Sequence, residues 1–192
     1  MRKETIEIYK FEELSEEAQE KAYENFLNSD KEYFWMDENL ESLKESLDYF
    51  GFHLADYSIH YYNATNAYLK IDSQHYDGEE ELKEVRLWKY LKNNYMEGSV
   101  VANTKYPNES NDLLSSSCLF TGYCMDDNFL NPIKKFMNKP TDISFTELMK
   151  ECAYEVMLGI EKDYEYQNSR EFFEEEVSSN GYEFTEDGER YY

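Results

Sequence analysis

The spacing of apolar residues between positions 36 and 50 constrains the fold more than any other feature of the sequence. These residues recur at intervals of four, three, four and three, which places them on one side of a helix covering about residues 31–50. The stripe consists of Met36, Leu40, Leu43, Leu47 and Phe50. Gly51 follows, and glycine is favoured just after a helix because it adopts left-handed backbone angles easily. The sequence therefore predicts a helix that buries one face in a core.

A second helix is predicted near the N-terminus, with one apolar face and one acidic face. Ser15 is an N-cap residue, and Glu16 and Glu17 follow where the helix dipole favours acids. The apolar stripe consists of Leu14, Ala18, Ala22 and Phe26. The opposite face carries Glu16, Glu20 and Glu24. We therefore expect this helix to bury one side and to present carboxylates on the other.

The longest helix is predicted over about residues 145–177. Ser144 and Glu147 form a Ser-x-x-Glu capping box at its start. Its buried side is expected to consist of Phe145, Leu148, Cys152, Val156, Ile160 and Tyr164. A shorter helix, stopped by Pro140, is predicted over residues 126–138.

The middle of the chain predicts one further helix and the longest loop. The helix covers residues 79–96, and its apolar side is expected to consist of Leu82, Val85, Trp88, Leu91 and Tyr95. Residues 97–117 are rich in Gly, Asn and Ser and contain Pro107, which is typical of a loop.

Alternating apolar and polar residues predict strands in three places. Residues 4–11 form the first, and residues 52–62 pair with a strand around residues 67–71 in an antiparallel hairpin that turns at 63–66. Near the C-terminus Tyr182 and Phe184 alternate with acids, which indicates a final strand or an extended arm. We expect an α+β fold, a short antiparallel sheet packed against several helices including one long C-terminal helix. It would be a single acidic domain over residues 1–192, with a loop-rich insertion around 97–145.

Motifs of common intracellular enzymes are missing from the sequence. It contains no phosphate-binding glycine loop, no H-E-x-x-H and no C-x-x-C, and its three histidines are most simply exposed or satisfied polar residues. Cys118, Cys124 and Cys152 have no zinc-like spacing and are interpreted as structural thiols of a reducing cytoplasm. We therefore expect no catalytic residue, no metal and no cofactor. Without an apolar segment long enough for a signal or a membrane span, we expect a location in the cytoplasm.

Net charge is the feature most informative about function. The chain has 42 Asp and Glu against 19 Lys and Arg, a net charge of −23. Solubility of a small domain needs a net charge of only about 2–8. Nucleic acid and anionic membranes repel such a surface, whereas a basic protein attracts it. Twenty-three charges equal those on about 39 Å of duplex DNA, so the surface has the charge to occupy a nucleic-acid channel.

The candidate binding residues are acidic helix faces with tyrosines and phenylalanines among them. One trio consists of Glu16, Glu20 and Glu24, and a second of Glu171, Glu174 and Glu175. Tyr164 and Tyr166 lie between acids in the sequence and are expected to add apolar anchoring. The oligomeric state is left open.

Both ends of the chain resemble a group of small phage and prophage proteins. The N-terminal match consists of Phe11, Glu12, Glu13, Leu14, Ser15, Glu16, Glu17, Ala18, Lys21 and Ala22, with Trp35 at a following aromatic position. The C-terminal match covers residues 182–188, Tyr-Glu-Phe-Thr-Glu-Asp-Gly. Most members of the group have no known function, and some small acidic phage proteins of this kind are anti-CRISPR or other anti-defence inhibitors. The resemblance implies such a role for the whole chain, in the cytoplasm of a host bacterium, and none for a single residue.

Three hypotheses follow. The first is an anti-CRISPR inhibitor that binds the basic nucleic-acid channel of an effector nuclease and blocks DNA or guide RNA, as an acidic nucleic-acid mimic. The second is a phage interaction protein directed at another host protein, such as a polymerase, a regulator or a toxin. The third is a metal-dependent enzyme, for example a nuclease with clustered carboxylates.

Overall fold

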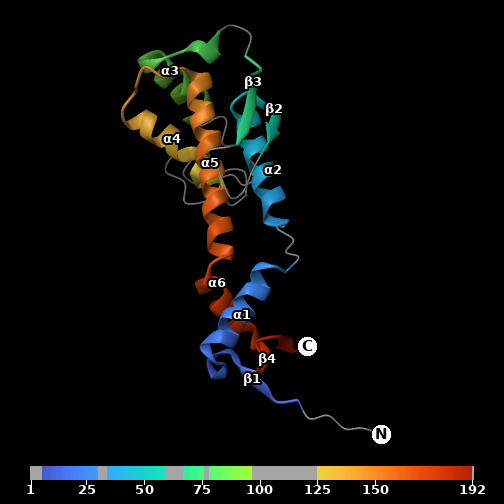
Figure 1. The fold of residues 1–192 in the computed structure, drawn as a ribbon. Coiled ribbons are helices and arrows are strands. Elements are labelled where there is room, and N and C mark those ends of the chain that lie inside the picture. The colour runs from blue at the N-terminus through green and yellow to red at the C-terminus, as the bar shows by residue number, and fades with distance from the viewer. Residues whose placement is uncertain (1–5, 30–33, 59–66, 76–77, 97–124, 192) are drawn as a thin grey trace. The chain divides into compact units, whose positions relative to one another are not determined.

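The protein has an α+β fold with six α-helices and two small antiparallel sheets in its described residues (Figure 1). The computed structural model describes residues 6–29, 34–58, 67–75, 78–96 and 125–191. The chain divides into two compact units. Unit 1 consists of Met1–Glu32 with Asp163–Tyr192, and unit 2 consists of Tyr33–Lys162. That the whole chain is one domain stays a prediction, and the predicted loop 97–117 lies outside the described residues.

The core of unit 2 is formed by helices α2 (Phe34–Tyr49), α4 (Asp126–Asn138) and α5 (Phe145–Gln167). The stripe predicted over residues 36–50 is confirmed in its second half. Leu43, Leu47 and Phe50 are fully buried, and Leu40 packs against the same core. Predicted helix boundaries also hold for α4, which ends two residues before Pro140.

The predicted hairpin of unit 2 consists of β2 (Phe52–Ser58) and β3 (Tyr68–Ser73), which pair antiparallel. Phe52, Leu54 and Ile71 point from the hairpin into the core. The turn predicted at 63–66 lies outside the described residues.

The single helix predicted over residues 79–96 is wrong, because this stretch contains three short helical segments. A 3-10 turn (η3, Glu79–Glu81) precedes α3 (Glu84–Leu91), and a π-helical segment (η4, Lys92–Met96) follows. Lys83, which lies between η3 and α3, is extended and pairs with Ser144, so α3 begins in a new register. As a result Val85 is 57% exposed, and Leu87 takes the buried position.

The predicted helix over 145–177 is also two helices, α5 and α6 (Arg170–Asn180). Its start is confirmed: the Ser144 backbone N–H donates to Glu147 Oε2 at 2.8 Å, and the Glu147 N–H donates to Ser144 Oγ at 3.2 Å. The break occurs at Ser169, whose backbone is extended and whose hydroxyl accepts from the Phe172 N–H at 3.1 Å. A serine that caps a new helix therefore ends the old one.

Unit 1 joins the two ends of the chain, seen in Figure 1 as blue and red segments side by side. Helix α1 (Glu16–Leu27) begins after Ser15 as predicted and packs against α6. A three-stranded antiparallel sheet has the order β1 (Ile8–Lys10), β4 (Glu183–Thr185), β5 (Arg190–Tyr191). The C-terminal end is therefore a short hairpin rather than a single strand or arm. The core consists of Phe11, Leu14, Ala18, Ala22, Phe173, Val177 and Phe184.

Candidate functional site

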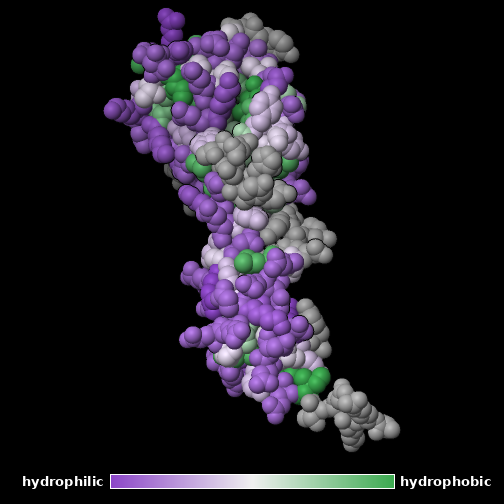
Figure 2. Space-filling model, in the orientation of Figure 1, coloured by the Kyte–Doolittle hydropathy of each residue, from purple (hydrophilic) through white to green (hydrophobic). Residues whose placement is uncertain are grey.

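All eight residues predicted to bind a partner lie in unit 1. Glu16, Glu20 and Glu24 are exposed on α1, and Glu171, Glu174 and Glu175 are exposed on α6. The rings of Phe26 and Phe173, 5.0 Å apart between centroids, hold these two helices together. The sequence-predicted trios therefore lie on two packed helices of one unit, within the largely hydrophilic surface seen in Figure 2.

Charge is concentrated in unit 1. Its two segments contain 20 Asp and Glu against 7 Lys and Arg, so that about a third of the chain carries −13 of the net −23. The rest of the chain, unit 2, has 22 acidic and 12 basic residues. Unit 1 is therefore the more strongly anionic of the two by a wide margin for its size.

Arg170 connects the two acidic trios. Its Nη1 pairs with the Glu20 carboxylate of α1, and its Nε donates to Glu174 Oε1 of α6 at 2.9 Å. The Glu174 hydrogen bond is the main reason that the pKa of Arg170 is raised. One cation thus joins a glutamate from each trio across the α1–α6 contact.

A second cation of unit 1 is held in the same way. Lys21 Nζ lies 2.7 Å from Asp187 Oδ2 and 3.5 Å from Glu189 Oε1, both from the β4–β5 turn. The Lys21 hydrogen bond, with a second from the Thr185 hydroxyl at 2.6 Å, lowers the pKa of Asp187 to about 2. Glu16, Glu24 and Glu171, by contrast, have no Lys or Arg within 4 Å among the described residues.

The two predicted tyrosine anchors differ in the structure. Tyr166 is exposed, donates its hydroxyl proton to Glu175 Oε2 at 2.7 Å, and rests edge-on against Phe172 with ring centroids 5.5 Å apart. Hydrogen bonding to Glu175 raises the pKa of Tyr166. Tyr164, which was also predicted on the buried side of the long helix, is only half-buried. The structure therefore brings Tyr166 together with the α6 trio.

Sequence reasoning missed the acids of the β4–β5 turn. Glu186 and Asp187 lie beside Glu17 and Glu20 around a surface hollow of about 480 Å³. They come from the other end of the chain, so no helical spacing indicates them. The Asp187-Gly188 pair is a turn signal that would have placed these acids at an exposed bend.

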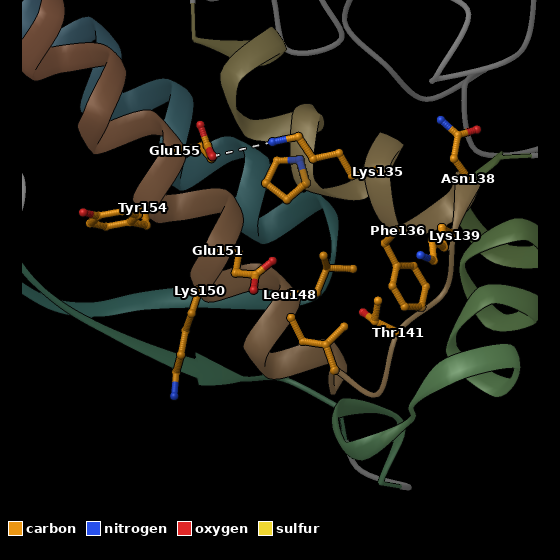
Figure 3. Close-up of a pocket in the computed structure, with 12 residues that line it drawn as sticks. Lys135, Phe136, Asn138, Lys139, Thr141, Leu148, Lys150, Glu151, Tyr154 and Glu155 are labelled. Atoms are coloured by element: carbon orange, nitrogen blue, oxygen red, sulfur yellow. Dashed lines mark ion pairs between the residues drawn. The ribbon is translucent and has the colours of Figure 1, made fainter.

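Unit 2 contains a hollow of about 820 Å³ between α4 and the start of α5 (Figure 3). Phe136 and Leu148 line its apolar side, and both are almost completely buried. Lys135 at its rim pairs with Glu155 at 3.9 Å. The hollow has the volume of a small-molecule site, and the described residues that line it include no His, Cys or Ser.

His75 and Cys152 pack within unit 2. His75 Nε2 lies 3.0 Å from the Phe50 carbonyl oxygen, and its ring packs against Phe52 and Phe145. Cys152 is fully buried, which raises the pKa of its thiol well above the usual value. Among the described residues, no three His, Cys, Asp or Glu side chains are grouped as metal ligands. Cys118, Cys124 and His60 lie outside those residues.

Comparison with known proteins identifies no relative: no family model, curated protein or solved structure matches the chain. The resemblance of its two ends to phage proteins therefore stays a prediction. In the described part of the chain, no helix has the length and apolar character needed to cross a bilayer.

Proposed function

We propose that this protein is a phage-type anti-CRISPR inhibitor that binds the basic nucleic-acid channel of an effector nuclease through unit 1. The observation that carries the proposal is the concentration of −13 in unit 1, where Arg170 and Lys21 are already held between carboxylates. Bound DNA or guide RNA and this surface would compete for the same lysines and arginines of the nuclease.

The spacing of the glutamates supports the role of a nucleic-acid mimic. Glu16, Glu20 and Glu24 follow one another about 6 Å apart along the α1 axis, since a helix rises about 1.5 Å per residue. Phosphates of one DNA strand rise about 3.4 Å per nucleotide. Along α1 these carboxylates are thus about half as dense as the phosphates along one DNA strand. Helix α6 supplies a second row of carboxylates, which Arg170 joins to the first.

Target-DNA cleavage by guide-loaded CRISPR nucleases, type II first, tests the proposal. The protein is added before or after the DNA, and we expect inhibition only when it is added before. Inhibition should weaken steeply as salt rises, because charge dominates the contact. Full activity across a panel of nucleases would contradict the CRISPR target, and a pull-down from host lysate would then look for another host protein.

A pair of triple variants locates the surface. Glu16, Glu20 and Glu24 all changed to Lys should abolish inhibition at physiological salt. The matched control changes Glu38, Glu41 and Glu45, which are exposed on α2 of unit 2, to Lys. Both variants have the same net charge, so equal loss in the two would show that total charge, not unit 1, matters. Far-ultraviolet circular dichroism confirms that each variant is folded, as expected for surface changes.

A further inference from the structure

The outer face of the three-stranded sheet in unit 1 carries exposed apolar side chains among polar ones. The register aligns Tyr9, Phe184 and Arg190 across the three strands, and Phe184 in this row is buried in the core. Strand alternation then places Ile8 with its partner Thr185, and Tyr191 with its partner Glu183, on the opposite side. Ile6 lies two residues before Ile8, just outside β1. The outer face of the sheet therefore consists of Ile8, Lys10, Glu183, Thr185 and Tyr191, and Ile6 comes directly before it in the chain.

The apolar side chains on this face are open to solvent. Ile6 is 58% exposed, Ile8 43% and Tyr191 47%, whereas the core of the same unit is below 10%. In all the described residues of unit 1 only five large apolar side chains are exposed, and three of them lie on this small sheet or directly before it. Figure 2 shows the matching hydrophobic patch over the start of β1, in a unit that is otherwise mostly hydrophilic. Such a patch inside a polar rim is the usual layout of a protein-binding surface.

The charges around the patch determine what it can accept. Glu7, Glu183, Glu186 and Glu189 lie on or next to the strands of the sheet. Of the two cations on the strands, Lys10 faces Glu183 across the register, and Arg190 stacks on the Tyr182 ring at 3.4 Å. An anionic membrane or a second copy of this acidic unit would be repelled. A Lys- and Arg-rich protein surface would be attracted.

We propose that the outer face of this sheet is the apolar centre of the docking surface of unit 1, and that its occupant is a basic protein surface with an apolar side chain among its lysines and arginines. The inference rests on the proposed function and adds to it the part of the contact that does not depend on charge. The carboxylates attract and orient the partner, and Ile6, Ile8 and Tyr191 hold it once water is excluded.

Two synthetic peptides of equal positive charge test this proposal without an identified partner. One is an oligo-arginine, and the other has the same number of arginines interspersed with leucines. At about 0.5 M salt, where charge is strongly screened, we expect the protein to bind the arginine–leucine peptide about tenfold more tightly than oligo-arginine. The double variant Ile6→Ser, Ile8→Ser should lose that preference and keep its low-salt binding of oligo-arginine. Leu27→Ser, an exposed apolar residue at the end of α1, is the control and should keep the preference.

The outcomes separate this inference from the proposed function. If the Ile6→Ser, Ile8→Ser variant retains the tenfold preference, the sheet face is not the apolar centre, whatever the nuclease assay shows. Sedimentation of a wild-type dimer that this variant abolishes would also overturn the proposal, because a second copy would then cover the face. If the preference depends on Ile6 and Ile8 but no nuclease is inhibited, the docking surface stands and the CRISPR target is wrong.

Discussion

Gly188 in the β4–β5 turn lies directly against the backbone of Ala18 in α1. A β-carbon at position 188 would be only 2.1 Å from the Ala18 carbonyl oxygen, and the φ angle of Gly188 is +83°. The turn that carries Glu186 and Asp187 can reach Lys21 because residue 188 has no side chain. The geometry of the acidic surface therefore depends on a glycine that bears no charge.

We expect Gly188→Ala to destabilise unit 1 by about 2–4 kcal/mol, through strain at positive φ and the backbone clash. Gly181→Ala is the matched control, because Gly181 also has positive φ but has nothing within 4 Å of a β-carbon. It should cost only about 1–2 kcal/mol. Urea unfolding measures both, and equal losses would contradict a special role for the Gly188–Ala18 contact.

Asp187 should make the stability of unit 1 depend on acid pH. Its folded pKa of about 2 lies below the ordinary value of about 3.9, so the folded state binds fewer protons than the unfolded state. The contribution is complete above about pH 4 and is lost as pH falls towards 2. Carbon NMR of the Asp187 carboxyl should give the low midpoint, and Lys21→Gln should raise it. A wild-type midpoint near 4 would contradict the Lys21 contact.

Arg170→Gln should change binding more than stability. Arg170, Glu20 and Glu174 are exposed, and exposed ion pairs contribute only about 0–1 kcal/mol. Losing the cation leaves Glu20 and Glu174 unpaired, so we expect tighter binding of oligo-arginine at low salt and no difference at high salt. Isothermal titration calorimetry at two salt concentrations checks this, with Arg86→Gln on α3 of unit 2 as the control. Weaker binding would show that Arg170 itself contacts the partner.

Ser144→Ala should cost about 1 kcal/mol by removing the cap of α5. The variant deletes the hydroxyl that accepts the Glu147 N–H at 3.2 Å. Ser179→Ala, at an exposed position in α6, removes a hydroxyl of the same kind and should change the free energy of unfolding by less than about 0.5 kcal/mol. Thermal unfolding of the two variants side by side measures the difference.

Features set by neighbouring residues were predictable from the sequence, and features set by distant contacts were not. The Ser15 cap, the Ser144–Glu147 capping box and the α2 stripe depend on residues within a few turns of each other. The helix break at Lys83 depends on pairing with Ser144, far along the chain. Apolar spacing alone cannot indicate it, so Val85 was placed on the wrong side.

The candidate site shows the same division. Helical spacing placed Glu16, Glu20 and Glu24 on one face of α1, and all three are exposed there. Glu20 and Glu174 meet only because Arg170 pairs with both, and that contact joins opposite ends of the sequence. That these residues bind a partner stays a prediction.

Unit 1 is made from both ends of the chain, and this has a consequence for its synthesis. Strand β1 leaves the ribosome before unit 2, but its partner β4 follows only after all of unit 2 has been made. The central strand of the sheet is thus translated after all of unit 2. A ribosome that stops before Glu183 would release a chain with α1 but without the strand that pairs with β1. The acidic surface is therefore assembled only on chains that have been translated through unit 2 and beyond β4.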